Sequence, residues 1–327
     1  MKSVGSPSRV TSLTPLMATP YPCVNCRRRL THVWACAGKP ARVSQLHPEE
    51  PIHVGGSDCA GVVAAVGENV KHWKAGDEVI THPNQTCGEC PACNGLEPLA
   101  CLEQKAWGFE TSWGSFGQFC RVQAQQLLPK PAGLSWAEAA CYGLKLFTAY
   151  RMLFVNCRIK PGDRVLVWGA SGGLGAYAIQ LCRAVSATPI CVVSSPEKEA
   201  YCRSLGAVAA IDYKVQDFTT AMPPCDVILD TIGGETHRRS LKMLKPGGTV
   251  VALAADPIPK ARERRNDVRD TMVNVRPTRE RLLQLFQWAT SGIIKPQVTH
   301  RFKPEEAGKA YAISESGHAR GKMVILF

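Results

Sequence analysis

Long apolar runs and early acidic residues are both missing from this sequence. No stretch of the 327 residues approaches the about 20 consecutive apolar residues that span a bilayer, so we predict no transmembrane segment and no membrane partner. Residues 1–48 hold seven Lys or Arg and no Asp or Glu, and the formal net charge of the chain is +12. Much of the basic character therefore belongs to the N-terminus.

The basic start has two further interpretations. Basic proteins often bind nucleic acid, but no nucleic-acid-binding motif accompanies the charge, and we predict no nucleic-acid partner. An arginine-rich start without acids also resembles an organellar transit peptide, although four prolines oppose the helix that such peptides form: Pro7, Pro15, Pro20 and Pro22. We expect a cytoplasmic location, with a mitochondrion or another organelle as the alternative.

No secretory signal peptide is evident either, and this decides how we interpret the fifteen cysteines. Without a signal peptide, a disulfide-rich secreted protein is disfavoured and a reducing compartment is expected. Most of the cysteines, such as Cys182 and Cys191 in apolar runs, are then small buried hydrophobes. The length is sufficient for two domains, each with a core of its own.

A glycine-rich turn in the segment RVLVWGASGGLGAYAIQ, residues 164–180, organises the chain. The apolar run Val165–Trp168 predicts a strand buried on both faces, and apolar residues at helical spacing follow the glycines. A strand, a glycine turn and a helix N-terminus together direct free backbone N–H groups at a pyrophosphate. We therefore predict a dinucleotide site at Gly169, Ser171, Gly172, Gly173, Leu174 and Gly175.

Further strands downstream support a Rossmann domain, because a lone glycine motif is weak. Apolar runs begin at Pro189, Val208, Asp226 and Thr249, with polar or helical connections between them, which predicts five parallel strands in all. A helix that starts at Pro196 and closes at Gly206 follows the second strand. The alternative is a glycine turn in an unrelated α/β protein.

The residues after the second predicted strand indicate the cofactor. An acidic residue there hydrogen-bonds the bare ribose of NAD, but this chain has Ser194 and Ser195, with Lys198 close behind. Hydroxyls and a cation favour a 2′-phosphate, so we predict NADPH. The alternative for Lys198 is an ordinary solvated helix lysine.

Four cysteines form a separate cluster with the spacing C-x2-C-x2-C-x7-C. They are Cys87, Cys90, Cys93 and Cys101, and the intervening Gly and Pro permit a tight loop. Four thiolates complete a tetrahedron around Zn²⁺ and leave no open position, so the predicted zinc is structural. An iron–sulfur cluster and unmetallated thiols remain alternatives.

These motifs resemble the medium-chain dehydrogenase/reductase superfamily. The resemblance lies in the glycine turn, the cysteine loop, the segment GSDCAGVVAAVGENVKHWKAGDEV from Gly56 and the closing GKMVILF. The segments from Trp107 and VVSSPEK look more narrowly like the crotonyl-CoA carboxylase/reductase branch. The resemblance implies an α/β fold in which a doubly wound Rossmann sheet is joined to a GroES-like, β-rich catalytic domain. The expected parts are a basic segment 1–31, a GroES-like domain 32–150, a Rossmann domain 151–284 and a returning segment 285–327.

The alcohol dehydrogenases of this superfamily bind a second, catalytic zinc, and this chain departs from their ligand pattern. Gly56, Ser57 and Asp58 stand where they carry Gly-His-Glu, and Leu144 or Lys145 stands at a cysteine ligand position. Cys141 lies close enough that a shifted alignment would restore that ligand. The resemblance implies hydride transfer without catalytic zinc, and a zinc alcohol dehydrogenase is the alternative.

The resemblance also implies roles for individual residues. NADPH would deliver hydride to an activated alkene or carbonyl of a small substrate, such as a CoA thioester or a quinone, while hydrogen-bond donors stabilise the enolate. Phe109 and Glu110 would line the substrate site, for which a packed aromatic and a surface acid are the alternatives. Thr148, Thr231 and Gly233 would lie near the nicotinamide, and Lys198 and Tyr213 near the 2′-phosphate. Family members usually form dimers or tetramers, so we expect a homo-oligomer.

The resemblance stops before about residue 32, where Thr31 and His32 replace an asparagine motif used for CO2 binding. Carboxylation is therefore not expected, and missing strands would expose sheet edges in the catalytic domain. The start is an incomplete gene model, a natural truncation or a divergent sequence, and a silent NADPH-binding protein is the competing function.

The charged stretch 256–281 is expected to be a solvated connection, or a basic rim for an acidic substrate. A helix with Leu282, Leu285, Phe286 and Ala289 on one face is expected after it, and a short helix from Pro304 and a final strand end the chain.

Overall fold

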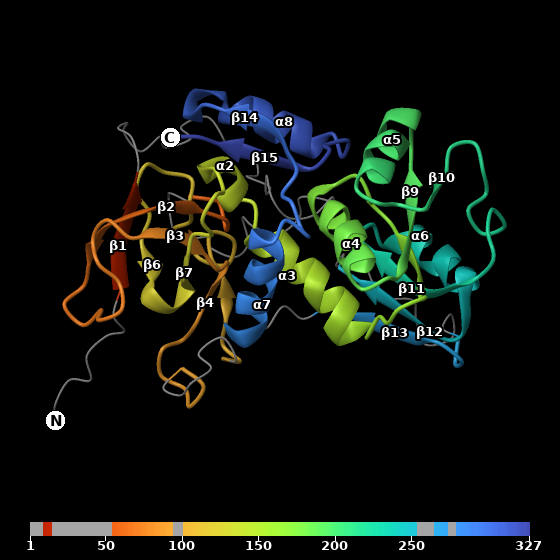
Figure 1. Cartoon of the computed structure of the whole chain (residues 1–327), viewed down its shortest axis with the longest axis horizontal. Coiled ribbons are helices and arrows are strands. Elements are labelled where there is room, and N and C mark those ends of the chain that lie inside the picture. Colours follow the sequence, from red (N-terminus) through yellow and green to blue (C-terminus); the bar gives the residue numbers. More distant parts are fainter. Residues whose placement is uncertain (1–8, 15–53, 94–100, 254–264, 274–278) are drawn as a thin grey trace.

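The protein has two lobes, seen side by side in Figure 1, with the C-terminal elements lying across the top of both. The computed structural model describes residues 9–14, 54–93, 101–253, 265–273 and 279–327. Thr31, His32 and part of the charged stretch lie outside the described residues. No helix among the described residues has both the length and the apolar character needed to cross a bilayer.

The Rossmann lobe is built on a six-stranded parallel sheet in the order β10-β9-β8-β11-β12-β13. This order, 3-2-1-4-5-6 along the chain, is that of a dinucleotide-binding domain. Its strands are β8 Arg164–Val167, β9 Thr188–Val193, β10 Ala209–Asp212, β11 Cys225–Asp230, β12 Leu244–Ala252 and β13 Arg269–Met272. The five strands expected from the sequence are all present, and β13 is an additional sixth.

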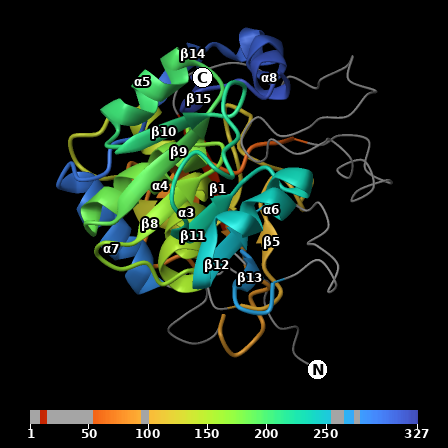
Figure 2. The ribbon, with the colours of Figure 1, turned by 90° about the vertical axis from the view of Figure 1, so that its right-hand side faces the viewer.

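Helices cover both faces of this sheet, and Figure 2 shows α4 and α6 on opposite sides of it. The helices of this lobe are α4 Gly173–Ala184, α5 Pro196–Ser204 and α6 Gly234–Ser240, and a 3-10 turn at Leu241–Met243 follows α6. Alternate residues of β8, together with Trp168 directly after it, enter different cores: Val165 and Val167 pack with α4, and Leu166 and Trp168 pack on the other face. A strand that is buried on both faces has no polar position, which explains the continuous apolar run.

The strand β13 corrects the expectation that the charged stretch is only a solvated connection. Asp267 and Arg265 precede β13 in a turn, and residues 269–272 pair in parallel with β12. The strand lies at the edge of the sheet, where charged side chains are tolerated because one side is open to water. Its polar sequence gave no apolar pattern from which a strand could be predicted.

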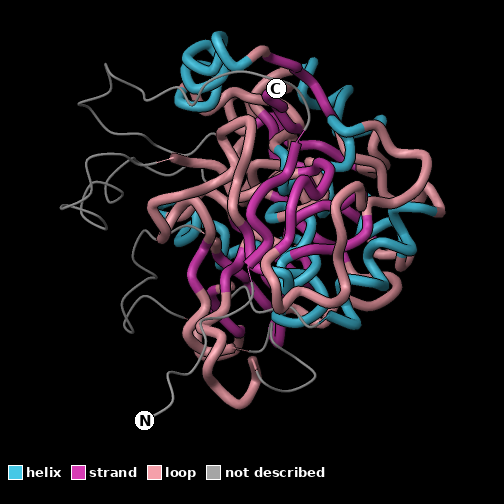
Figure 3. The backbone as a smooth tube through the Cα atoms, turned by 90° about the vertical axis from the view of Figure 1, so that its left-hand side faces the viewer, coloured by secondary structure: helices cyan, strands magenta, loops and turns pink. Residues whose placement is uncertain are grey.

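The second lobe, which we call the catalytic lobe after the GroES-like catalytic domain expected from the sequence, contains a five-stranded sheet in the order β6-β1-β2-β3-β7. Figure 3 views the molecule from the side of this lobe. The strands of this lobe, together with the small pair β4 and β5, are β1 Arg9–Thr14, β2 Ala60–Val66, β3 Glu78–Thr81, β4 Asn84–Gln85, β5 Lys105–Ala106, β6 Val122–Gln123 and β7 Leu127–Pro129. Strand β1 is antiparallel to both β2 and β6. Residues 9–14 thus fill an interior place in this sheet, although the sequence analysis placed them in a separate segment.

Helical elements join the two lobes. They are α2 Trp136–Ala139, α3 Leu144–Tyr150, the π-helical turn Arg151–Asn156 that extends α3, and α7 Arg279–Thr290. In α7, Leu285 and Ala289 are buried as expected. The chain ends with β14 Val298–Phe302, a 3-10 turn Pro304–Glu306, α8 Ala307–Glu315 and β15 Lys322–Ile325. The domain boundaries proposed from the sequence stay predictions.

Candidate active site

The glycine turn lies between β8 and α4 and leaves no room for side chains. Gly169 has a φ of 63°, in the left-handed region, and a side chain there would overlap Thr231 Oγ1. A Cβ on Gly175 would come within 2.5 Å of Ala170 Cα, which shows how tightly the first turn of α4 packs on the loop. The turn is therefore a shallow backbone surface at a helix N-terminus, which is the form that a pyrophosphate site takes.

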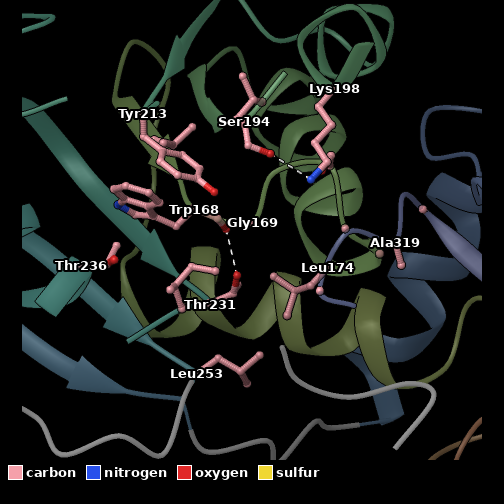
Figure 4. Close-up of a pocket in the computed structure, with 18 of the residues that line it drawn as sticks. Trp168, Gly169, Leu174, Ser194, Lys198, Tyr213, Thr231, Thr236, Leu253 and Ala319 are labelled. Carbon is pink, nitrogen blue, oxygen red and sulfur yellow. Dashed lines mark hydrogen bonds between the residues drawn. The ribbon is translucent and has the colours of Figure 1, made fainter. Parts of the chain in front are cut away.

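A cleft of about 400 Å³ opens above this turn, and Figure 4 shows its walls. It lies at the carboxyl ends of the parallel strands, on both sides of β8, where the strand order reverses. Of the predicted cofactor residues, nine line it: Gly169, Ser171, Gly172, Gly173, Leu174, Ser194, Lys198, Tyr213 and Thr231. Residues from the C-terminal segment, including Ala319, Gly321 and Lys322, complete the wall.

One end of the cleft carries the cation that the sequence singled out. Lys198 Nζ donates a hydrogen bond of 3.1 Å to Ser194 Oγ, and the two side chains point toward each other in Figure 4. Partial burial lowers the pKa of Lys198, and the neighbouring charges of Lys214 and Arg320 lower it further. Such a convergence of cations beside a hydroxyl suits a phosphate, which would relieve their repulsion.

Ser195 has a different role from its neighbour. It caps α5, and its Oγ accepts a hydrogen bond from the backbone N–H of Lys198 at 3.4 Å. The cap orients the first turn of α5, from which Lys198 projects. Ser195 therefore acts through Lys198 and does not line the cleft.

The other end of the cleft lies after β11. Thr231 Oγ1 donates to the carbonyl of Trp168 at 3.0 Å and joins this turn to the end of β8. Gly233, with a φ of 79°, precedes α6 and does not line the cleft, but Thr231 and Ile232 beside it do. The backbone N–H of Gly233 donates to Asp230 Oδ1 at 3.0 Å. The turn is thus held by its own backbone contacts and by a buried carboxylate.

Three predicted catalytic residues lie outside this lining. Thr148 is buried in α3, and its Oγ1 donates to the carbonyl of Leu144 at 2.7 Å. Glu110 is exposed, and its carboxylate accepts from the N–H of Ala106 at 2.6 Å. Phe109 is half-buried in the same turn of the catalytic lobe. Their catalytic roles stay predictions.

The residues at the positions that hold catalytic zinc in the alcohol dehydrogenases make other contacts in this chain. Ser57 Oγ donates to the carbonyl of Trp107 at 2.6 Å, and Asp58 Oδ2 accepts from Lys322 Nζ at 2.8 Å. Burial raises the pKa of the Cys141 thiol to about 12, and its Sγ donates to the carbonyl of Ala137. Lys145 lines the cleft from α3. These side chains offer no converging ligand set.

The four predicted zinc ligands come together in the catalytic lobe. The ligand atoms of Cys87, Cys90, Cys93 and Cys101 all lie within 4.8 Å of one another, and the Sγ atoms of Cys87 and Cys101 are 3.6 Å apart. A Zn–S bond of about 2.3 Å implies a separation of about 3.8 Å in a tetrahedron, which fits. Backbone N–H groups of Glu89 and Cys90 hold the pKa of the Cys87 thiol down at about 6, so they favour the thiolate that a metal requires.

No sequence pattern predicted the contributions of Arg320, Lys322 and His237 to this region. Arg320 and Lys322 lie far from the glycine turn in sequence, and Gly321 between them donates to the carbonyl of Ser171 at 2.9 Å. His237 lies on α6 behind the turn that follows β11. The closing GKMVILF motif was the one signal available, and it indicated a family and not a contact.

Two family models match the chain: a zinc-binding dehydrogenase over residues 205–325 and an alcohol dehydrogenase GroES-like domain over residues 23–132. The latter begins before residue 32, where the sequence analysis placed the start of the resemblance. The crotonyl-CoA carboxylase/reductase of Cereibacter sphaeroides is 51% identical over 184 residues, which are 56% of this chain and 43% of that protein. The chain spans about half the length of the curated relatives it matches.

Solved structures agree with the sequence comparison. A crotonyl-CoA carboxylase/reductase is 32% identical, with a TM-score of 0.77 over 99% of this chain and 82% of that one. The 2-octenoyl-CoA carboxylase reductase CinF in complex with NADP and 2-octenoyl-CoA is 33% identical, with a TM-score of 0.72 over 84% of this chain and 68% of that one. The predicted Rossmann and GroES-like fold is thus confirmed, and the chain belongs to the medium-chain dehydrogenase/reductase superfamily, close to its crotonyl-CoA carboxylase/reductase branch.

Proposed function

We propose that this protein is an NADPH-dependent reductase that transfers hydride to the activated alkene of an enoyl thioester or a quinone-like substrate, without a catalytic zinc. The observation that carries the proposal is the pair of Lys198 and Ser194 at one end of a cleft whose floor is the glycine turn. The relatives supply the substrate class, since their names include crotonyl-CoA and 2-octenoyl-CoA.

The residues present fit a dinucleotide. The glycine turn is a cradle that a Cβ at Gly169 or Gly173 would fill, and its N–H groups and the N-terminus of α4 would hold the pyrophosphate. Lys198, with Ser194, would hold the 2′-phosphate, and the turn at Thr231 would orient the nicotinamide half. NADPH bound there would supply the hydride. The walls from the Rossmann lobe and from the C-terminal segment would exclude water from the cleft.

A structural zinc is part of the proposal. The four thiols would hold Zn²⁺ as a closed tetrahedral site, which stabilises the loop 87–101 and takes no part in the reaction. We propose no ion at Ser57 and Asp58, because neither side chain is directed at a shared ligand position.

A second function is favoured by one specific observation. Phe109, Glu110 and Thr148 do not line the described cleft, which is the arrangement expected of a cofactor-binding protein without turnover. The two functions share NADPH binding and differ in catalysis.

The test is a fluorescence titration of the purified chain with NADPH and NADH, with zinc determined on the same sample, followed by NADPH oxidation over a panel of enoyl-CoAs and quinones. We expect tighter binding of NADPH than of NADH, one zinc per chain and turnover of at least one substrate. Binding without turnover would favour the silent protein. Two zinc ions and NAD-linked oxidation of alcohols would favour an alcohol dehydrogenase, and absence of NADPH binding would refute both proposed functions.

A further inference from the structure

A buried charged cluster lies behind the turn that follows β11. His237 on α6 lies between two carboxylates: its Nδ1 is 2.8 Å from Asp230 Oδ2, and its Nε2 is 3.3 Å from Asp270 Oδ2. All three side chains are almost completely buried, with at most 6% of any of them exposed. Asp230 ends β11 and Asp270 lies on β13, so the cluster joins two strands that β12 separates.

The two facing carboxyl groups favour the charged form of the imidazole. An ionised carboxylate accepts hydrogen bonds and does not donate them, and with one such group facing each ring nitrogen of His237, the imidazolium is the form that can donate to both. Burial by itself would lower the pKa of His237, but the hydrogen bonds to Asp230 and Asp270 outweigh burial and raise it to about 9. His237 is therefore a buried cation at neutral pH.

No other charged group competes for this imidazolium among the described residues. The facing groups are Asp230 from β11 and Asp270 from β13. On its own helix, Glu235 pairs with Arg238 at 3.0 Å, and Arg239 pairs with Asp217 at 2.9 Å, both at the surface. Asp270 Oδ1 has no hydrogen-bond partner in the described part of the chain, so His237 is the principal contact of that carboxylate.

The cluster is connected directly to the cleft. While Oδ2 of Asp230 accepts from His237, its Oδ1 accepts from the backbone N–H groups of Ile232 at 2.8 Å and Gly233 at 3.0 Å. Thr231 and Ile232 line the cleft, as does Thr236 next to His237. The position of the Asp230 carboxylate therefore sets the path of the turn.

The turn lies on one particular side of the cleft. In a doubly wound sheet each half of the strand order takes one mononucleotide, and Lys198 marks the β9 side as the half for the 2′-phosphorylated adenosine. The turn after β11 is on the opposite side of β8, which leaves it the nicotinamide half. Figure 4 shows this separation, with Thr231 and Leu253 away from Lys198.

We propose that His237 is a positioning residue that holds the turn 231–233 through Asp230, and so sets the affinity of the cleft for the nicotinamide half of NADPH. The inference rests on the proposed NADPH binding. It predicts that affinity for the nicotinamide half depends on protonation of His237, which lies behind the turn and outside the cleft.

Adenosine 2′,5′-bisphosphate separates the two halves in an experiment. This probe occupies the adenosine half alone, so any change at Lys198 alters its binding and that of NADPH together, and the ratio of the two dissociation constants reports on the nicotinamide half. We would measure both constants for the wild type, His237→Gln and Asp270→Asn between pH 6.5 and 10.5. Glu235→Gln, an exposed change on the same helix, is the matched control, and circular dichroism checks the fold.

For the wild type we expect the preference for NADPH over the probe to fall about tenfold as pH rises through about 9. His237→Gln is expected to show the reduced preference at every pH, and Asp270→Asn to move the transition about one pH unit lower. If His237→Gln does not fold, the wild type and Asp270→Asn still test the proposal. A ratio of the two dissociation constants that is independent of pH and of these substitutions would overturn the proposed role of His237. Failure of the wild type to bind either NADPH or adenosine 2′,5′-bisphosphate would instead overturn the proposed function.

Discussion

At the scale of single residues, the proposed preference for NADPH rests on Lys198. Its ammonium lies beside Ser194 Oγ. Burial lowers the pKa of Lys198, and the like charges of Lys214 and Arg320 lower it further. A 2′-phosphate would bring charge-assisted hydrogen bonds to this group, while a bare ribose would not. The proposed preference for NADPH therefore depends on one ammonium group that the cap at Ser195 orients.

Removal of that ammonium should weaken NADPH binding selectively. We expect Lys198→Ala to raise the dissociation constant of NADPH on the order of 10- to 100-fold, as for loss of a charge-assisted hydrogen bond, and to change that of NADH by less than about twofold. Fluorescence titration measures both constants. Lys242→Ala, at an exposed position after α6, is the control and should change neither. Equal losses for NADPH and NADH would show that Lys198 does not recognise the phosphate.

The buried imidazolium of His237 also makes a prediction about stability. Its pKa is raised from 6.5 to about 9, so its stabilising contribution is complete below pH 6.5 and is lost as pH rises toward and through 9. We expect the difference in unfolding free energy between the wild type and His237→Gln to decrease by roughly 3 kcal/mol from pH 6 to pH 9.5. Urea denaturation at a series of pH values measures it. A difference that stays constant with pH would mean that His237 is neutral in the folded protein.

At the scale of elements, the strand β8, the glycine turn and α4 act as one unit. The strand is buried on both faces, the turn has no side chains in the way, and the first turn of α4 packs directly on the loop. Close packing of backbone on backbone cannot relax by rotating a side chain. The unit is therefore rigid where a phosphate would meet it.

A methyl group at Gly175 tests this rigidity. Its Cβ would lie 2.5 Å from the carbonyl oxygens of Gly169 and Ala170, so we expect Gly175→Ala to destabilise the protein by about 1–3 kcal/mol and to weaken NADPH binding at least tenfold. The same change at Gly308 in α8 meets nothing within 4 Å, and Gly308→Ala should be neutral or stabilise by about 1 kcal/mol. Thermal unfolding and NADPH titration of both variants check this. Equal behaviour of the two would contradict the packing argument.

At the scale of the whole molecule, the C-terminal segment joins the lobes. Lys322 pairs with Asp58 of the catalytic lobe at 2.8 Å, with both side chains at most 3% exposed. Its neighbour Gly321 donates to the carbonyl of Ser171 in the glycine turn. The same two residues thus contact the catalytic lobe and the cofactor cleft, which places one wall of the cleft.

Loss of one partner should cost more than loss of the pair. A buried charge without its partner is unfavourable, so we expect Asp58→Asn and Lys322→Met each to lower the unfolding free energy by about 3–5 kcal/mol. The double variant should be less destabilised than either single variant, because neither charge is left alone. Denaturant unfolding of the four proteins of the cycle gives the coupling. Additive effects would show that the pair contributes nothing of its own.

The sequence alone determined what depends on local pattern. Apolar runs and the glycine spacing indicated five strands of the Rossmann sheet and the turn at Gly169–Gly175, because a strand buried on both faces has few polar residues and a phosphate-binding turn has few side chains. The spacing of the four cysteines likewise indicated their convergence. Strand β13 was missed, since an exposed edge tolerates charge and leaves no apolar period.

Only the tertiary structure decided which distant residues meet. Asp58 and Lys322 are 264 positions apart, and nothing in either local sequence indicates the other. Asp270 meets His237 because β13 joins the edge of the sheet, which follows from strand order and not from composition. A local sequence pattern reflects which side chains of a segment are exposed to water and which backbone conformation the segment adopts. The charge state of a buried group depends instead on the partners that the whole fold brings to it.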